Sequence, residues 1–372
     1  MRQERGKGGP PQPPRSRQQK PEAEDRVRPG ITRMFATAIP GLAPLVIREL
    51  NALQGIEVTD SGFDGRSDFI LFDVERGARD RVWSVHTVED IFVEVGRTMR
   101  SSGDRPHWIA GRIWRPERVQ RALSVWADEV RPLAGSMTFR VIARVLQERS
   151  FKRTDLRRHV HNAVSSDKPK WKFADPAQVE VWISEYRQGR LVAGLRLSDV
   201  SMRQHEGREV ERSGALRPTV AAAMITLAGE PSGTLLDPCC GSGTILLEAA
   251  GAGWTPEGSD IDPEAVEIAR QNIPEAPIRR ADARDLDLAD GSVGACVSNL
   301  PFGQQYEVQG NMQDWLHTVL TELSRVTQRG GRVILLAPSI PRSAVPATLH
   351  LRDRYPIRLL GTKTTIWAYD RV

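Results

Sequence analysis

The sequence predicts an α/β protein of several domains, whose C-terminal part is built on an open, mostly parallel sheet. Its 372 residues are too many for one ordinary hydrophobic core. Hydrophobic residues make up 40% of the chain and charged residues 27%, which is typical of folded, water-soluble proteins. From Leu216 onward, β-type runs alternate with helical patterns. We therefore expect folded N-terminal units followed by an α/β domain over residues 216–372.

Residues 1–30 have the composition of a disordered basic tail. Ten of them are Pro or Gly, and eight Lys or Arg stand against four Asp or Glu. Large apolar side chains are scarce, so folding could not offset the loss of chain entropy. The composition fits either a solubilising leader or salt-sensitive contacts with phosphates.

Residues 31–98 predict a small domain with the order βαββαβ, a ferredoxin-like arrangement. Apolar residues at helical spacing follow the first strand, and apolar and other residues alternate in the last one. The segments expected to form strands are 31–41, 67–75 and 89–97, and those expected to form helices are 42–53 and 80–88.

Residues 99–200 predict a second α+β unit with concentrated positive charge. Strands are expected at 137–146 and 179–186, and helices at 119–133 and 154–164. The second helix has Thr154 as its N-cap, and Leu156, Val160 and Val164 form a stripe that should pack inward.

The stretch around this second helix is a candidate RNA-binding surface. Residues 137–172 hold ten Lys or Arg against three Asp or Glu, and aromatic residues are interleaved with them. A solvated helix face would also carry such a charge run, but the aromatic residues favour contact with RNA. The expected contacts are Lys152, Arg153, Arg157, Arg158, Lys168, Lys170 and Lys172.

After a linker at 201–215, the chain repeats strand–loop–helix units. Asp237–Thr244, with the sequence DPCCGSGT, lies where a strand meets a helix, so its glycines would let a ligand approach the backbone N–H groups. Leu246 takes the place of the third glycine of a dinucleotide fingerprint, and no Lys-Ser/Thr pair ends the loop as an ATPase requires. The loop therefore predicts a nucleotide-like ligand without phosphates.

Two later strand ends place carboxylates beside this loop. Asp260 is the candidate to accept both ribose hydroxyls, with Asp262 second because it is better suited to capping the next helix. Asp282 follows the third strand and is expected to hydrogen-bond an adenine amine.

These stretches together carry a family resemblance. LLDPCCGSGT, GSDID, ADARDL and SNLPFG resemble class I S-adenosylmethionine (SAM)-dependent methyltransferases that modify exocyclic amines. LRPTVAAAM at 216–224 is similar to the segment that covers the methionine end of the cofactor in RNA guanine-N2 methyltransferases with a THUMP domain. The basic unit at 99–200 is similar to a THUMP domain. The resemblance implies a seven-stranded Rossmann-like catalytic domain with an antiparallel last strand.

It also implies a cofactor site and a catalytic site. The expected SAM contacts are Pro218, Thr219, Asp237, Cys239, Gly241, Ser242, Gly243, Thr244, Asp260, Ile261, Asp282, Ala283 and Asn299. In the catalytic stretch, Asn299 and the Leu300 carbonyl would accept the two hydrogens of the target amine, which orients its lone pair. Pro301 would fix that carbonyl, and Phe302 would stack on the extruded base.

The cysteines indicate neither metal nor covalent chemistry. Cys239, Cys240 and Cys296 form no CxxC pair, and none follows a proline at the catalytic strand end.

No apolar run is long enough to cross a membrane or to form a signal peptide. We expect a cytoplasmic monomer without a metal ion.

The leading hypothesis is methylation of the guanosine N2 amine in tRNA. Position 6 of the acceptor stem is favoured, and position 10 is possible. Ribosomal RNA guanine-N2 and adenine-N6 methylation stay open as alternatives within the enzyme class. A noncatalytic RNA-binding protein is the alternative from another class, which the intact glycine loop and Asn299 disfavour.

Overall fold

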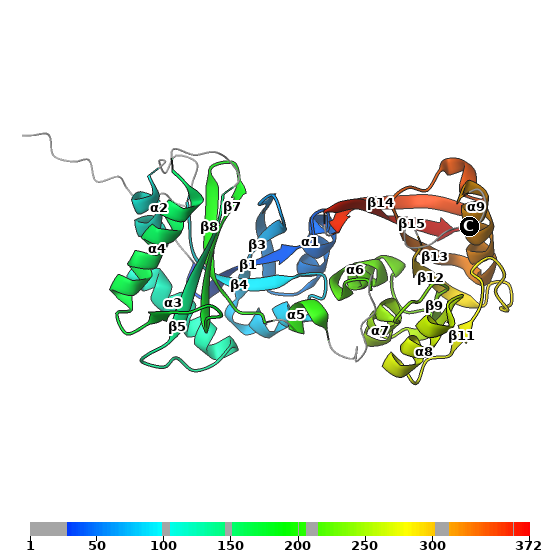
Figure 1. Cartoon of the computed structure of the whole chain (residues 1–372), viewed down its shortest axis with the longest axis horizontal. Helices are drawn as coiled ribbons and strands as arrows, with labels where there is room; N and C mark the ends of the chain where they lie inside the picture. The colour runs from blue at the N-terminus through cyan, green and yellow to red at the C-terminus, as the bar shows by residue number, and fades with distance from the viewer. Residues whose placement is uncertain are drawn as a thin grey trace, which may run out of the picture.

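The computed structural model shows a chain of two lobes joined by a short linker (Figure 1). It describes residues 28–98, 105–145, 151–199, 201–205, 215–301, 312–359 and 361–372. Most of the expected tail at 1–30 lies outside these ranges, and so does Phe302. Within the described ranges, no helix has the length and apolar character needed to cross a bilayer.

One eight-stranded sheet forms the N-terminal lobe, in the order β2-β3-β1-β4-β8-β7-β5-β6. β4 pairs antiparallel with β8, with Val93 opposite Leu195, so the sheet runs without a break through both units expected at 31–98 and 99–200. The strands are β1 (Ile31–Ala38), β2 (Ile56–Phe63), β3 (Asp68–Glu75), β4 (Asp90–Thr98), β5 (Thr138–Arg144), β6 (Lys172–Phe173), β7 (Val179–Arg187) and β8 (Arg190–Arg196).

Amphipathic helices cover this sheet because their apolar stripes match its buried face. The expected inward stripe of α4 is confirmed, since Leu156, Val160 and Val164 are fully buried. Trp126 on α3 is also buried, and its indole Nε1 donates a hydrogen bond to the Arg196 carbonyl at 3.0 Å. The helices are α1 (Ala43–Ala52), α2 (Pro106–Ile113), α3 (Pro116–Glu129) and α4 (Arg153–Asp167).

The sequence-based elements of this lobe differ from the structure in several places, among them β6 and β8, which were not predicted. The helix expected at 80–88 is wrong: the 3-10 helix η2 spans Arg76–Ser84, and the Glu89 N–H then bonds the Thr37 carbonyl beside the sheet. Strand β2 was not located, because its sequence IEVTDSGF lacks apolar alternation in its second half. Helix α2 was also not predicted, because it is only eight residues long.

The C-terminal lobe contains the predicted seven-stranded sheet, in the order β11-β10-β9-β12-β13-β15-β14. The five strands β11, β10, β9, β12 and β13 run parallel to one another. β15 runs antiparallel to both β13 and β14, which confirms the expected closing hairpin. The strands are β9 (Thr234–Asp237), β10 (Thr255–Asp260), β11 (Ile278–Arg280), β12 (Val293–Asn299), β13 (Thr327–Ala337), β14 (Leu349–Leu359) and β15 (Thr362–Arg371).

Helices on both faces complete this α/β lobe. Nearly every residue of α6 is buried, and this helix packs against α7, β12 and β13. Asp262 caps α8 by accepting a hydrogen bond from the Glu264 N–H at 3.0 Å. The helices are α6 (Pro218–Ala228), α7 (Thr244–Gly251), α8 (Pro263–Asn272) and α9 (Met312–Val326), and the short α5 (Ser201–Gln204) belongs to the linker.

Polar contacts from the stretch just before β4 hold the two lobes together. The Glu89 carboxylate accepts hydrogen bonds from Arg217 at 2.8 Å and from the Thr219 hydroxyl at 2.9 Å. Next to it, Asp90 forms an ion pair with Arg203 of the linker. The N-terminal lobe therefore contacts the start of α6 directly.

Candidate active site

The carboxyl ends of the parallel strands bring the predicted site residues to one edge of the C-terminal sheet. Asp237 ends β9, Asp260 ends β10 and Asn299 ends β12. Gly258 stands opposite Asp237 in the β9–β10 pair, and Asn299 stands opposite Leu336 in the β12–β13 pair. Ligands of open α/β sheets bind at this edge, where the strand order reverses. Between β9 and β12 the order does reverse.

Backbone hydrogen bonds, one within the loop and one to β10, fix the loop between β9 and α7. The Gly243 N–H bonds the Cys240 carbonyl at 2.8 Å, and the Cys240 N–H bonds the Ser259 carbonyl at 2.9 Å. Gly243 has φ +85°, and a Cβ there would come within 2.7 Å of the Ile273 side chain. Gly241 has φ +54°, yet a Cβ there would meet no atom within 4 Å. The loop thus packs tightly on one side and faces open space at Gly241.

Asp260 and Asp262 have different roles in the structure. One oxygen of Asp260 accepts the Gly241 N–H at 2.9 Å, and the other accepts the Asp262 N–H at 3.0 Å. Asp262 serves as the N-cap of α8, as the capping alternative predicted. The Asp260 carboxylate therefore lies against the glycine loop, and the neighbouring Ile261 exposes 59% of its surface.

Asp282 is already paired in this structure. The guanidinium of Arg284 contacts both of its carboxylate oxygens, with the shortest distance 2.6 Å, and this hydrogen bonding lowers the pKa of Asp282. The next residue, Ala283, is buried. An adenine amine could bond Asp282 only by sharing or displacing the Arg284 contact.

Asp237 is a buried carboxyl group, and none of the residues that the structure describes offers it a cation as hydrogen-bond partner. Its Oδ1 accepts hydrogen bonds from the Ser298 hydroxyl at 2.7 Å and from the Cys239 N–H at 3.2 Å. Burial raises the pKa of Asp237 to about 7, and the negative charge of Asp260 adds to the increase. Sequence analysis missed Ser298, although a hydroxyl within the apolar run VGACV was a signal for a buried polar partner.

The catalytic stretch is described only as far as Pro301. The Leu300 N–H bonds the Leu336 carbonyl at 3.2 Å, so the chain stays attached to β13 after Asn299. The Leu300 side chain is buried, whereas Asn299 and Pro301 are partly exposed. The predicted stacking residue, Phe302, lies outside the described residues.

The remaining predicted cofactor contacts lie near the same edge. Ser242 and Thr244 are buried around the start of α7, and the Ser242 carbonyl accepts a hydrogen bond from the Asn272 amide at 2.9 Å. Pro218 and Thr219 begin α6 and are buried at the junction with the N-terminal lobe. The Thr219 hydroxyl is engaged by Glu89, which the sequence could not indicate.

The three cysteines are poor candidates for nucleophiles. Burial raises the pKa of the Cys239 and Cys240 thiols far above neutrality and that of Cys296 to about 12. The thiolate is the reactive form of cysteine, so these thiols stay protonated at neutral pH.

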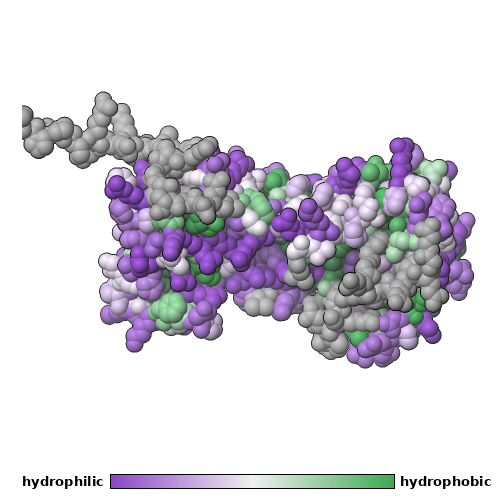
Figure 2. All heavy atoms as spheres, turned by 45° about the horizontal axis from the view of Figure 1, so that its top comes forward, coloured by the Kyte–Doolittle hydropathy of each residue, from purple (hydrophilic) through white to green (hydrophobic). Residues whose placement is uncertain are grey.

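A basic hollow of about 760 Å³ lies on the N-terminal lobe between β5 and α4. Arg140, Arg153, Arg157, Arg158, His161 and Phe173 are among its lining residues. The His161 ring stacks on Phe139 with 5.0 Å between centroids, and Phe173 exposes 64% of its surface. Figure 2 shows hydrophilic residues over most of the visible face of this lobe.

The structure brings together only some of the predicted RNA contacts. Arg153, Arg157 and Arg158 line the hollow, and Arg158 also pairs with Asp155 at 3.0 Å. Lys168 pairs with Asp167 at 3.3 Å. The side chains of Lys152, Lys170 and Lys172 are exposed but are not part of the lining, and Trp171, one of the aromatic residues in the stretch 137–172, is buried.

Three relatives of this chain are named as guanine-N2 methyltransferases. The chain is 28% identical over 255 residues to the tRNA (guanine(10)-N2)-dimethyltransferase of Methanothermobacter thermautotrophicus, which covers 65% of this chain and 71% of that protein. It is 26% identical over 355 residues to the tRNA (guanine(6)-N2)-methyltransferase of Thermus thermophilus, which covers 91% of this chain and 99% of that protein. The match to the human U6 snRNA (guanine-N(2))-methyltransferase THUMPD2 is 31% identical but spans only 29% of that protein.

Solved structures share the fold over nearly the whole chain. The crystal structure of TrmN from Thermus thermophilus superposes with a TM-score of 0.73 at 23% identity, covering 92% of this chain and all of that one. The family model described as an RMKL-like methyltransferase domain, UPF0020, matches residues 205–345, which include the glycine loop, Asp260 and Asn299. The C-terminal lobe therefore carries an RMKL-like methyltransferase domain over residues 205–345.

Proposed function

We propose that this enzyme transfers a methyl group from SAM to the N2 amine of a guanosine in tRNA. One observation carries the proposal: the glycine loop, Asp260 and Asn299 meet at one sheet edge, in a chain that matches a tRNA (guanine(6)-N2)-methyltransferase over 99% of its length. That end-to-end match also favours position 6 of the acceptor stem over position 10. The proposal places the enzyme in the cytoplasm as a monomer.

The residues at the sheet edge fit SAM. Open space at Gly241 leaves room for a ligand against the loop backbone, and the loop carries no lysine that would recognise a phosphate. Each Asp260 oxygen accepts one backbone N–H and keeps a further lone pair for a ribose hydroxyl. Ile261 offers an exposed apolar surface beside them, against which an adenine ring could pack.

Asn299 and Leu300 would orient the target amine. A guanine N2 lone pair is delocalised into the ring, so catalysis depends on aligning that pair with the methyl carbon. SAM would supply this methyl group: the bond from its sulfonium sulfur to the methyl carbon breaks as the bond to N2 forms, the sulfur leaves as a neutral thioether, and the methylated amine releases one proton to water. The Asn299 side-chain oxygen and the Leu300 carbonyl would each accept one amine hydrogen, and the attachment of Leu300 to β13 would keep both acceptors in place. Phe302 would stack on the flipped base.

The N-terminal lobe would hold the RNA backbone. Arg153, Arg157 and Arg158 project from one helix around the basic hollow, where Phe173 offers an exposed ring for stacking. Guanidinium groups beside an aromatic face are typical of single-stranded or end-of-helix RNA recognition. The hollow would therefore bind a stretch of tRNA away from the methylated nucleotide.

The test is methylation of tRNA and, in a separate reaction, of ribosomal RNA, both from a strain that lacks the gene. Full-length protein is incubated with labelled SAM, and the nucleosides are identified after digestion. N2-methylguanosine should form with the wild type and with Asn51→Ala, an exposed asparagine on α1, while Asn299→Ala should lose at least 100-fold in rate. Labelling of ribosomal RNA alone, or formation of N6-methyladenosine, would replace the proposal by the corresponding alternative. Unchanged methylation by Asn299→Ala would contradict the catalytic assignment.

A further inference from the structure

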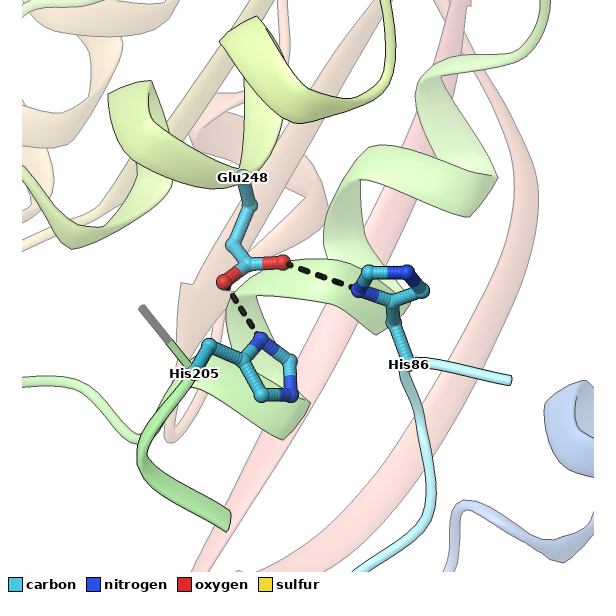
Figure 3. A group of neighbouring side chains, drawn as sticks. All are labelled: His86, His205 and Glu248. Carbon is cyan, nitrogen blue, oxygen red and sulfur yellow. Dashed lines mark hydrogen bonds and ion pairs between the residues drawn. The ribbon is translucent and has the colours of Figure 1, made fainter. Parts of the chain in front are cut away.

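Three metal-ligating side chains meet at the junction of the two lobes (Figure 3). His86 belongs to the segment between η2 and β4, His205 follows α5, and Glu248 lies on α7. These segments are far apart in the sequence, so no spacing motif announced the group. The cluster is separate from the sheet edge described above, although Glu248 is one helical turn from the glycine loop.

The geometry of the cluster converges on one point. Each oxygen of the Glu248 carboxylate faces a different imidazole: Oε1 lies 2.6 Å from His205 Nδ1, and Oε2 lies 3.9 Å from His86 Nδ1. One ligand atom from each residue lies within 4.8 Å of the other two. The two rings meet edge to face, with centroids 5.3 Å apart, so neither blocks the space between the donors.

A hydrogen bond explains the contact of Glu248 with His205 but not its contact with His86. The distance from His205 to Glu248 is that of a charge-assisted hydrogen bond, whereas 3.9 Å from His86 is too long for one. Around a tetrahedral zinc ion, donor atoms lie about 3.3 Å apart, because each is about 2.0 Å from the metal. One ligand atom from each residue lies within 4.8 Å of the other two, so the three donors would have to move closer together to bind one ion, and the His86 side chain, which is 59% exposed, lies at the surface where it can make this movement.

The surroundings leave these donors available for a cation. Among the residues that the structure describes on either side of the linker, Arg203 pairs with Asp90 and Arg217 with Glu89. Glu248 is only 10% exposed and His205 15%, so a bound ion would be shielded from bulk water on that side. Two imidazoles and one carboxylate, with a fourth position open to water, form a common zinc ligand set.

We propose that His86, His205 and Glu248 bind a single divalent transition-metal ion, of the zinc class, between the two lobes. The ion replaces the proton on His205 Nδ1 and draws His86 onto the same centre. It joins the N-terminal lobe, the linker and α7 at one point, beside the existing contacts of Glu89 and Asp90. The site is structural, and it does not depend on the proposed RNA substrate.

Titration of the metal-free, full-length protein with Co²⁺ and Zn²⁺ tests the site. Calorimetry should give one equivalent of bound metal, and Co²⁺ should develop a visible absorption band typical of low coordination. Zn²⁺ should also raise the melting temperature, by an amount that grows with the logarithm of its concentration divided by its Kd. His86→Ala, which removes an exposed side chain, and Glu248→Gln should each weaken binding at least tenfold and abolish the thermal shift.

His159→Ala is the matched control, because His107 and His159 form another histidine pair, with ring centroids 6.0 Å apart. This variant should bind metal as the wild type does. Absence of saturable binding by the wild type would overturn the proposal, and so would equal affinity in His86→Ala or a loss confined to His159→Ala. Circular dichroism of each variant separates loss of the site from loss of the fold.

Discussion

The free energy of unfolding of Asp237→Asn, minus that of the wild type, should increase as the pH rises from acidic to alkaline values. The Asp237 carboxyl is 1% exposed, and its hydrogen-bond donors are the neutral Ser298 hydroxyl and Cys239 N–H. Burial raises its pKa from 3.8 to about 7. The folded state therefore holds this proton more tightly than the unfolded state does.

The sign and size of the effect follow from that pKa. Because the unfolded carboxyl ionises near pH 4 and the folded one near pH 7, wild-type stability falls as the pH rises between these values and is constant above them. Between pH 5 and pH 8 the loss amounts to about 2.5 kcal/mol. Asp237→Asn removes this loss, because the amide does not titrate. Its own NH₂ lacks an acceptor, which costs about 1–3 kcal/mol at every pH.

The assay is urea unfolding of the SAM-free protein at pH 5 and pH 8. The free energy of unfolding of Asp237→Asn minus that of the wild type should increase by about 2.5 kcal/mol between the two pH values. Asp287→Asn, on the surface, is the control and should show no such change. A difference for Asp237→Asn that is the same at both pH values would refute the assignment of a buried, protonated carboxyl group.

Three further predictions concern the loop, the basic hollow and the lobe contact. Gly243→Ala should lower the free energy of unfolding by roughly 1–3 kcal/mol, because of the positive φ and the clash with Ile273. Gly241→Ala should lower the free energy of unfolding by only about 1 kcal/mol, but it should weaken SAM binding measured by calorimetry. Arg157→Gln should reduce the slope of log K against log salt for tRNA binding by about one, with equal slopes contradicting an RNA contact. Glu89→Gln should lower the melting temperature slightly, since a partly exposed ion pair contributes about 0.2–1 kcal/mol, and an unchanged value would show that the pair is not stabilising.

The sequence predicted the C-terminal lobe better than the N-terminal lobe. In the α/β part, each strand end is marked by a short polar sequence, so the strand order and the closing hairpin could be inferred. In the N-terminal lobe, β2 carries polar residues on an edge strand, and periodicity alone does not identify it. The 3-10 helix at 76–84 was read as a later α-helix because its mixed composition matches neither period well.

Contacts between distant segments were beyond sequence reasoning. The roles of Asp260 and Asp262 could be separated in advance because capping depends on local spacing. By contrast, the bond from Ser298 to Asp237 and the hold of Glu89 on Thr219 join residues from different elements. No local pattern encodes such pairs, and the same holds for the cluster of His86, His205 and Glu248.

The pairing of β4 with β8 determines how the N-terminal lobe can be divided. A fragment that ends near residue 98 would expose the whole hydrogen-bonding edge of β4, and one that begins near 99 would expose that of β8. Unprotected edges of this length recruit other chains and aggregate. The smallest piece of this lobe that keeps both edges paired therefore runs from about residue 28 to residue 199, and any exchange of N-terminal lobes between relatives would have to move it whole.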